Sequence, residues 1–257
     1  RKVDEKGIMR KVMGTVDQDY LDSIAHSKYK GKVQTGELAI ITTFSDIAFD
    51  HKGNMFISDR LNHQIRKVSA QGKITTIAGT GESAHYGDGG PASEASFRDP
   101  SALTTDKEGN LYIGDGANNL VRKIDTKGIV STVAGNGNHE NSGDGGPALK
   151  AGIKNIDYLA ISPAGELHIV GMNSHIVRKV TKDGKIVAVA GKGYQGFFGD
   201  GGPATKAMLK SPTAIAFDQT GNLYISDMGN SRIRKVDTSG IITTFAGTGT
   251  FGWAQDG

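Results

Sequence analysis

Histidine side chains are the first candidates for chemistry in this chain, because imidazole can bind a metal ion or transfer a proton near neutral pH. The seven histidines are scattered, and no two of them stand in an H-x-H or H-x-x-x-H arrangement. His63 and His175 come nearest to a set, since they occupy the same position in two copies of a repeated sequence, with Asn119 in the copy between them. A metal-dependent enzyme has only weak support, and we predict no metal site and no cofactor.

Asparagine and histidine residues recur at one short polar turn in each copy of the repeat. Such residues tolerate left-handed backbone conformations and cap nearby backbone groups, which is the interpretation that we favour. The alternative is that they form a polar binding surface, together with the adjacent Met172. The residues concerned are Asn62, His63, Asn118, Asn119, Met172, Asn173, His175, Asn230 and Ser231.

Aromatic residues gather in the long glycine-rich connections that end each copy. One shared position is filled by His85, Asn141, Phe197 and Trp253. We favour the interpretation that these side chains hold each loop against its own repeat unit; the alternative is a stacking surface for a peptide, a glycan or a base. The candidate binding residues in these loops are His85, Tyr86, Tyr194, Phe197, Phe198 and Trp253.

Aspartate and arginine also recur in register. Asp59 stands seven residues before Arg66, and the second and fourth copies repeat this pair. Neighbouring antiparallel strands would bring the two side chains of each pair together, so we predict ion pairs with a structural role.

The third copy breaks this pattern, because Gly171 replaces the aspartate and leaves Arg178 without its usual partner. The same copy has His168 where the others have an aromatic residue. We favour sequence drift as the reason. The alternative is that Arg178, His168 and Met172 line a local ligand pocket.

Three copies end in Gly-Asp-Gly-Gly-Pro-Ala, which invites comparison with phosphate and calcium loops. The motif lacks the Lys-Ser/Thr of a phosphate loop and the alternating carboxylates of a calcium loop. We therefore predict that Asp88, Asp144 and Asp200 bond to backbone amides of their own loops, while the glycines and proline shape the turn.

The elements that position all these residues repeat every 56 residues, with related strings beginning at Ser45, Ser101, Asp157 and Thr213. Within one copy, four short alternating segments are separated by three turns and followed by a long connection. Four strands per repeat is typical of a β-propeller blade. Both faces of the first two strands carry apolar residues, which a sheet packed between two others requires. We predict an all-β propeller of four-stranded antiparallel blades, with about four and a half blades present.

The expected units are a half blade with a long loop at 1–44, full repeats at 45–100, 101–156 and 157–212, and a last repeat at 213–257. In the first connection, 31–36 reads GKVQTG where the glycine-rich motif would stand. This count does not close a ring of blades. We therefore expect a fragment of a longer propeller, or an open arc whose blade edges could support self-association.

The Asp-x-x-Gly-Asn turns, the Arg-Lys-Val strands and the Gly-Asp-Gly-Gly-Pro-Ala loops together resemble the NHL-repeat family over residues 45–257. The resemblance implies a β-propeller, most often one with six blades. It also implies a binding module, since most members of the family bind partners and only a few relatives are lyases.

Composition narrows the function further. Cysteine is absent, which excludes disulfides and cysteine metal sites, and no apolar run approaches the length of a membrane helix. A net charge of +3 is too small to indicate nucleic-acid binding by itself. We predict a non-catalytic binding or scaffold propeller, extracellular or periplasmic, that takes a protein, small-molecule or glycan ligand on the face formed by its long loops. A metal-dependent lyase is the alternative, and an RNA-binding propeller is a further one.

Overall fold

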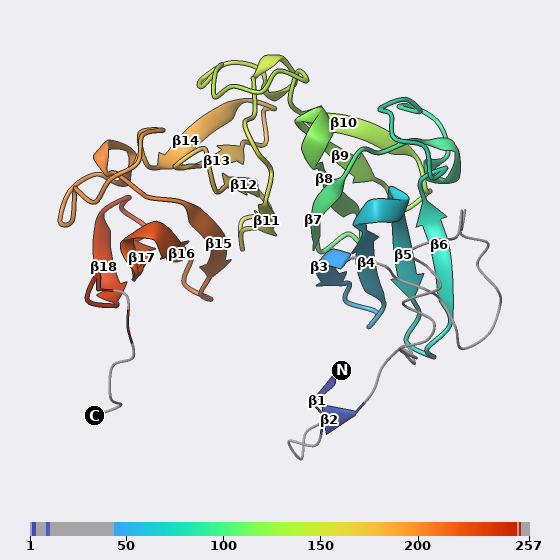
Figure 1. Cartoon of the computed structure of the whole chain (residues 1–257), viewed down its shortest axis with the longest axis horizontal. Coiled ribbons are helices and arrows are strands. Elements are labelled where there is room, and N and C mark those ends of the chain that lie inside the picture. Colours follow the sequence, from blue (N-terminus) through green and yellow to red (C-terminus); the bar gives the residue numbers. More distant parts are fainter. Residues whose placement is uncertain (1, 4–8, 11–43, 251, 253–257) are drawn as a thin grey trace.

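The computed structural model describes residues 2–3, 9–10, 44–250 and 252, and Figure 1 shows their arrangement. The first four-stranded sheet contains β3 (Phe44–Phe49), β4 (Met55–Asp59), β5 (Gln64–Val68) and β6 (Ile74–Ala78). The second contains β7 (Pro100–Thr105), β8 (Leu111–Asp115), β9 (Leu120–Ile124) and β10 (Val130–Ala134). The third contains β11 (Tyr158–Ile161), β12 (Leu167–Gly171), β13 (Ile176–Val180) and β14 (Ile186–Ala190). The fourth contains β15 (Pro212–Phe217), β16 (Leu223–Asp227), β17 (Arg232–Val236) and β18 (Ile242–Ala246).

Short 3-10 helices mark two recurring places in these repeats. After the second strand of a sheet stand η1 (Arg60–Asn62), η3 (Gly116–Asn118) and η6 (Met228–Asn230). Inside the long connections stand η2 (Ala92–Glu94), η4 (Ala148–Lys150) and η5 (Ala204–Lys206). A separate two-stranded antiparallel sheet pairs β1 (Lys2–Val3) with β2 (Met9–Arg10). The long first connection of the sequence analysis lies outside the described residues.

Each sheet is a meander in which consecutive strands pair antiparallel. The turn between the first two strands closes through its aspartate: Asp50 Oδ1 accepts hydrogen bonds from the amides of Lys52 and Asn54, both at 2.9 Å. Asp106 and Asp218 accept the amide of the equivalent asparagine in the same way. This local network explains why the Asp-x-x-Gly-Asn sequence specifies a hairpin. The predicted strands and turns are confirmed in the four described sheets.

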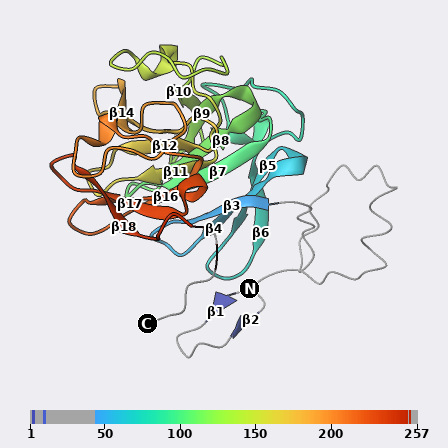
Figure 2. The ribbon, with the colours of Figure 1, turned by 60° about the vertical axis from the view of Figure 1, so that its left-hand side comes forward.

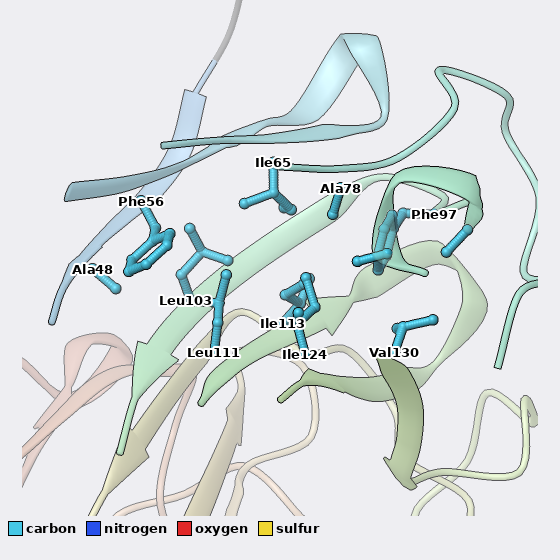
Figure 3. Packing of buried hydrophobic residues seen from close by; sticks show 12 residues of the cluster. Ala48, Phe56, Ile65, Ala78, Phe97, Leu103, Leu111, Ile113, Ile124 and Val130 are labelled. Atoms are coloured by element: carbon cyan, nitrogen blue, oxygen red, sulfur yellow. The ribbon is translucent and has the colours of Figure 1, made fainter. Parts of the chain in front are cut away.

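The hydrophobic core lies between the sheets rather than within any one of them. Figure 3 shows Phe56 and Ile65 of the first sheet facing Leu103 and Ile113 of the second, with Phe97 of the connecting loop beside them. Two further clusters fill the spaces between the second and third and between the third and fourth sheets. Because a fully buried aliphatic or aromatic side chain contributes about 1.5–3 kcal/mol, each blade depends on its neighbours for stability.

The four sheets follow one another along an open arch, with the first strand of each on the inside (Figures 1 and 2). Adjacent first strands are linked directly: Leu103 N donates to Asp46 Oδ2 at 2.9 Å and Thr105 Oγ1 donates to the Phe49 carbonyl oxygen at 2.7 Å. The described blades do not close a ring. The four meandering sheets that follow one another with their first strands inside confirm the predicted all-β propeller architecture of four-stranded antiparallel blades.

The outer sides of the first and last described blades carry exposed apolar residues. Ile47 and Phe49 of β3 and Phe245 of β18 are all more than two-fifths exposed. These positions face the two ends of the arch and have no neighbouring blade among the described residues. The described part of the chain contains no helix that is long and apolar enough to cross a bilayer.

Candidate functional site

The turn after the second strand is built around a left-handed residue. His63, Asn119, His175 and Ser231 have φ values of 54, 54, 55 and 51°. In three of the repeats this residue caps a 3-10 helix, and its amide bonds to the carbonyl oxygen three residues earlier. Left-handed geometry is the reason why asparagine, histidine and serine recur here. The left-handed conformation that the sequence predicts for these turns is present at these four residues.

The two matching histidines act as backbone caps. His63 Nδ1 accepts the Asp99 amide at 3.2 Å, and His175 Nδ1 accepts the Ser211 amide at 3.1 Å. Each ring therefore fixes the start of the next blade, and burial lowers the pKa of His175. Within the described residues, no three histidine, aspartate or glutamate side chains come close enough to share a metal ion.

The asparagines of these turns hold buried carboxylates. Asn118 Nδ2 donates to Asp115 Oδ2 at 2.9 Å and to the Ala84 carbonyl oxygen at 2.8 Å. Asn230 repeats both contacts, with Asp227 at 2.8 Å and the Gly196 oxygen at 2.7 Å. These amides tie the tip of each long loop to the following blade, so Asn118 and Asn230 position the loops.

The predicted pairs of aspartate and arginine within one sheet are present. The nearest oxygen and nitrogen atoms are 2.9 Å apart for Asp59 and Arg66 and 3.6 Å apart for Asp115 and Arg122. The fourth sheet repeats the pair at 3.3 Å. All these side chains are buried, and burial raises the pKa of Asp115 to about 6 despite its hydrogen bonds and the arginine charge.

The aspartate of each Gly-Asp-Gly-Gly-Pro-Ala loop contacts the next blade, which corrects the sequence prediction. Asp88 Oδ1 lies 2.7 Å from Arg122 Nη2, and Asp200 Oδ1 lies 2.7 Å from Arg234 Nη2. Asp144 pairs with Arg178 Nε at 3.0 Å. The prediction assumed bonds inside the loop. Instead, each loop crosses the blade boundary, and its carboxylate reaches an arginine whose donors point toward the loop. We call segments 87–92, 143–148 and 199–204 the clasp loops.

Backbone hydrogen bonds extend every clasp along the outer strand of the next blade. Gly89 N donates to the Val130 oxygen at 2.8 Å, and Val130 N donates to the Gly90 oxygen at 3.0 Å. Ile186 and Ile242 make the same reciprocal bonds with the other two clasp loops. The long connection therefore does not stay on one face of the arch. Its second half serves as a short extra edge strand.

Arg178 has a full set of partners although its own sheet lacks the aspartate. Its guanidinium bonds to Asp144 and to the carbonyl oxygens of Gly152 and Ser142, at 2.7 and 2.6 Å. A Cβ atom at Gly171 would overlap the backbone oxygen of Asn155, so an aspartate does not fit there. The clasp aspartate supplies Arg178 with a carboxylate that its own sheet lacks.

Arg178, His168 and Met172 do not form the pocket that the sequence suggested. Arg178 lies opposite Ile169 in the strand register, and His168 lies opposite Lys179, so the two side chains project from opposite faces of the sheet. Both are buried. The His168 ring packs edge-on against Phe217, with ring centroids 4.8 Å apart, and its Nδ1 lies 3.0 Å from the Glu166 carbonyl oxygen.

The first halves of the long connections expose aromatic rings. Tyr194 is 63% exposed, Phe198 is 65% exposed, and Tyr86 and Phe197 are 47% and 44% exposed. His85 is exposed as well, and Trp253 lies outside the described residues. Leu61 and Met228, which are not among the residues predicted from sequence, are more than half exposed in the turns after the second strand. The sequence feature that could have identified them is an apolar side chain in an otherwise polar turn.

Phe197 contacts the next blade, whereas the interpretation favoured from sequence placed this position against its own repeat unit. The guanidinium carbon atoms of Arg232 and Arg234 lie 3.9 and 4.9 Å from its ring centroid. At the equivalent position Asn141 Nδ2 donates to the Ser174 oxygen of the next blade at 3.2 Å. At Phe197 and Asn141 the shared loop position therefore contacts the next blade along the arch.

A family model described as the teneurin NHL domain matches residues 80–195 and 193–255. The chain belongs to the teneurin NHL domain family. Teneurin-m of Drosophila melanogaster is 32% identical to this NHL domain over 222 residues, which is 76% of this chain and 8% of that protein. Teneurin-3 of Mus musculus is 30% identical over 223 residues, with the same coverage. The NHL domain thus spans less than a tenth of the length of these relatives.

Solved structures share the fold at low sequence identity. A streptogramin B lyase superposes with a TM-score of 0.54 at 13% identity, covering 81% of this NHL domain and 56% of the lyase. An auxiliary nutrient binding protein from Bacteroides ovatus gives 0.59 at 16% identity, covering 82% and 48%. These likenesses support the propeller fold of the NHL domain.

Proposed function

We propose that this NHL domain is a non-catalytic binding module that captures a partner protein through the exposed rings of its long loops. Tyr194 and Phe198 carry the proposal, because both are more than three-fifths exposed on one loop. A tyrosine and a phenylalanine offer large contact areas with few rotatable bonds, and such rings are frequent at protein interfaces.

The loop that presents these rings is held by hydrogen bonds at Gly196 and Phe198. Gly196 N donates to the Leu209 oxygen and Met208 N donates to the Phe198 oxygen, both at 3.1 Å. The side chain of Asn230 bonds to the Gly196 oxygen from the next blade. A preorganised loop loses less conformational entropy on binding, which favours recognition by Tyr194 and Phe198.

The arrangement of charge does not favour RNA as the partner. The arginines that repeat in the third strands are buried in ion pairs with aspartates, so they cannot reach a phosphate backbone. A protein surface with an apolar patch suits the exposed rings better than a polyanion does.

The test compares two sets of substitutions in binding to an array of purified extracellular protein domains, with a glycan array in parallel. We expect Tyr194→Ala with Phe198→Ala to abolish saturable capture of the protein ligand and to leave the melting temperature within about 2 °C, since both rings are mostly exposed. Phe197→Ala is the matched control. Unlike the double variant, it should lower the melting temperature, because Phe197 packs on Arg232 and Arg234.

Two results would contradict the proposal. A large loss of stability in the Tyr194 and Phe198 double variant would show that these rings support the fold. Saturable binding confined to the glycan array would assign the rings to carbohydrate stacking.

We also propose, from the similarity to teneurins over three quarters of the chain, that the domain acts outside the cytoplasm. Antibody labelling of intact cells that carry the full-length protein tests this location.

A further inference from the structure

The first blade differs from the other three in its outer edge. Clasp loops lie on the second, third and fourth blades, and each is supplied by the connection that precedes that blade. The connection before the first blade has no Gly-Asp-Gly-Gly-Pro-Ala sequence. Within the described part of the chain, no segment pairs with the outer side of β6.

The first strand position of β6 differs in burial from the equivalent positions of the clasped blades. Val130, Ile186 and Ile242 begin the outer strands of the clasped blades, and all three are fully buried. Ile74 occupies the same position in the first blade and is partly exposed. In the clasped blades the backbone N–H and C=O of this residue bond to the two glycines of the loop. The equivalent groups of Ile74 have the same position on an edge that no described residue covers.

Arg66 occupies the position of the arginines that bind a clasp carboxylate in the other blades. In the second blade, Arg122 bonds to Asp88 and donates to the loop carbonyl oxygens of Ser96 and Tyr86, at 3.3 and 3.4 Å. Among the described residues, the Arg66 guanidinium contacts Asp59 and the hydroxyl of Thr76. The arginine that elsewhere receives a clasp is therefore present here, and no described residue supplies a clasp to it.

The Arg66 guanidinium can pair with a second carboxylate in addition to that of Asp59. Arg122 already lies between Asp88 and Asp115, at 2.7 and 3.6 Å, and Arg234 lies between two aspartates in the same way. Thr76 also matches Thr132 and Thr244, which donate to the clasp aspartate through the amide and the hydroxyl, at 3.0 and 2.6 Å. Asp59 therefore does not exclude an incoming aspartate.

We propose that the edge formed by Arg66, Ile74 and Thr76 is a docking site for an extended Gly-Asp-Gly-Gly-Pro segment of another polypeptide. The segment adds a short strand to β6 through its glycines, and its aspartate pairs with Arg66. The occupant is identified by the three clasps of this chain, which show the same sequence on the same kind of edge. The site lies apart from the exposed loop rings, so it goes beyond the proposed function and can fail independently of it.

The test uses the full chain and a synthetic peptide of residues 84–97, AHYGDGGPASEASF, with a fluorescent label. We expect saturable 1:1 binding by fluorescence anisotropy. A peptide with Asp88→Asn should bind at least about tenfold more weakly, because a charge-assisted bond to the Arg66 guanidinium is lost. Hydrogen exchange should show new protection at the Ile74 amide and no change at Val130, Ile186 and Ile242.

Two protein variants sharpen the result. Arg66→Lys keeps a positive charge beside Asp59 but removes the planar guanidinium, and we expect at least about a tenfold loss of peptide affinity with an unchanged circular dichroism spectrum. Arg178→Lys, in a blade that already has its clasp, is the matched control and should bind the peptide as the parent does.

Several outcomes would overturn the proposal. These are absence of saturation at millimolar peptide, equal affinity of the asparagine peptide, and protection at Val130 in place of Ile74. Tighter peptide binding after replacement of 31–36 by Gly-Ser repeats would show that this chain already covers the edge itself. A concentration-dependent dimer that the peptide dissociates supports the proposal, and it identifies a second copy as the polypeptide.

Discussion

At the residue scale, His168 replaces the aromatic residue that the other copies carry as Phe56, Tyr112 and Tyr224. Its ring is buried against Phe217, and burial lowers its pKa to about 4. A histidine whose pKa is lower in the folded state binds its proton more tightly in the unfolded state. Stability is therefore complete above the unfolded pKa of about 6.5 and is lost as the pH falls toward 4.

We expect His168→Phe to remove most of this pH dependence, because phenylalanine fills the same site without a titrating group. The measurement is the free energy of unfolding from urea denaturation at several values between pH 4 and pH 7. The parent should lose up to about 3 kcal/mol over this range relative to the variant. Parallel curves for the two proteins would show that His168 is not the group that titrates.

Arginines in equivalent positions should contribute differently to the free energy of unfolding, according to the number of carboxylates that each one neutralises. Arg122 contacts the fully buried Asp115 and also Asp88, whereas Arg178 has only Asp144, which is 44% exposed. We expect Arg122→Met to cost about 3–5 kcal/mol at pH 7, since it leaves a buried charge without a partner. Arg178→Met should cost less, because Asp144 can be solvated. Chemical denaturation of both variants tests this order, and a larger cost for Arg178→Met would contradict it.

At the element scale, the clasp loop depends on glycine at one position for space and at another for backbone conformation only. Gly87 has φ +99°, and a Cβ there would lie 2.6 Å from Ala95 Cα. Gly89 has φ +82°, with nothing within 4 Å of its added Cβ. We expect Gly89→Ala to cost about 1–2 kcal/mol from left-handed strain, and Gly87→Ala to cost clearly more. Equal melting temperatures for the two variants would show that the clasp yields to the added methyl group.

Protonation of the clasp aspartates should also contribute to the loss of stability at acid pH. Burial by itself raises the pKa of Asp88, but hydrogen bonds from Thr132 and the charge of Arg122 outweigh it and hold the pKa below the ordinary value. A carboxyl with a lowered pKa in the folded state stabilises the fold above its unfolded pKa, about 3.9, and this contribution is lost as the pH falls through the folded pKa. We expect Asp88→Asn to show a smaller drop in melting temperature between pH 5 and pH 2 than the parent. An equal or steeper drop would contradict this role.

Local sequence was sufficient to predict the strands, the turns and the Asp–Arg pairs within a sheet. These features depend on residues close together in the chain, such as Asp50 and Asn54 or Asp59 and Arg66. The clasp was not predicted, because a repeat fixes a residue's position within a blade but does not say which blade its loop contacts. The signal that could have found it was Arg178, which keeps its place although its sheet has lost the aspartate.

At the scale of the whole molecule, the long connections serve two purposes in separate segments. The tips, with Tyr194 and Phe198, expose rings to solvent, and the clasp loops hold the next blade. The exposed rings of these loops could be predicted only coarsely. Sequence placed exposed aromatics in these loops, but exposure separates Tyr194 and Phe198 from Phe197, which packs on two arginines. That distinction depends on contacts between blades, which a single repeat does not encode.

Hydrogen exchange of the full chain, followed amide by amide, tests this division of the connections most directly. The amides of Gly89, Ala92 and Val130 bond across a blade boundary, so we expect them to exchange as slowly as the central strands. The amides of Tyr194 and Gln195 should exchange rapidly. Rapid exchange at Gly89 and Ala92, at the rate of the loop tips, would show that the clasps do not hold the blades together.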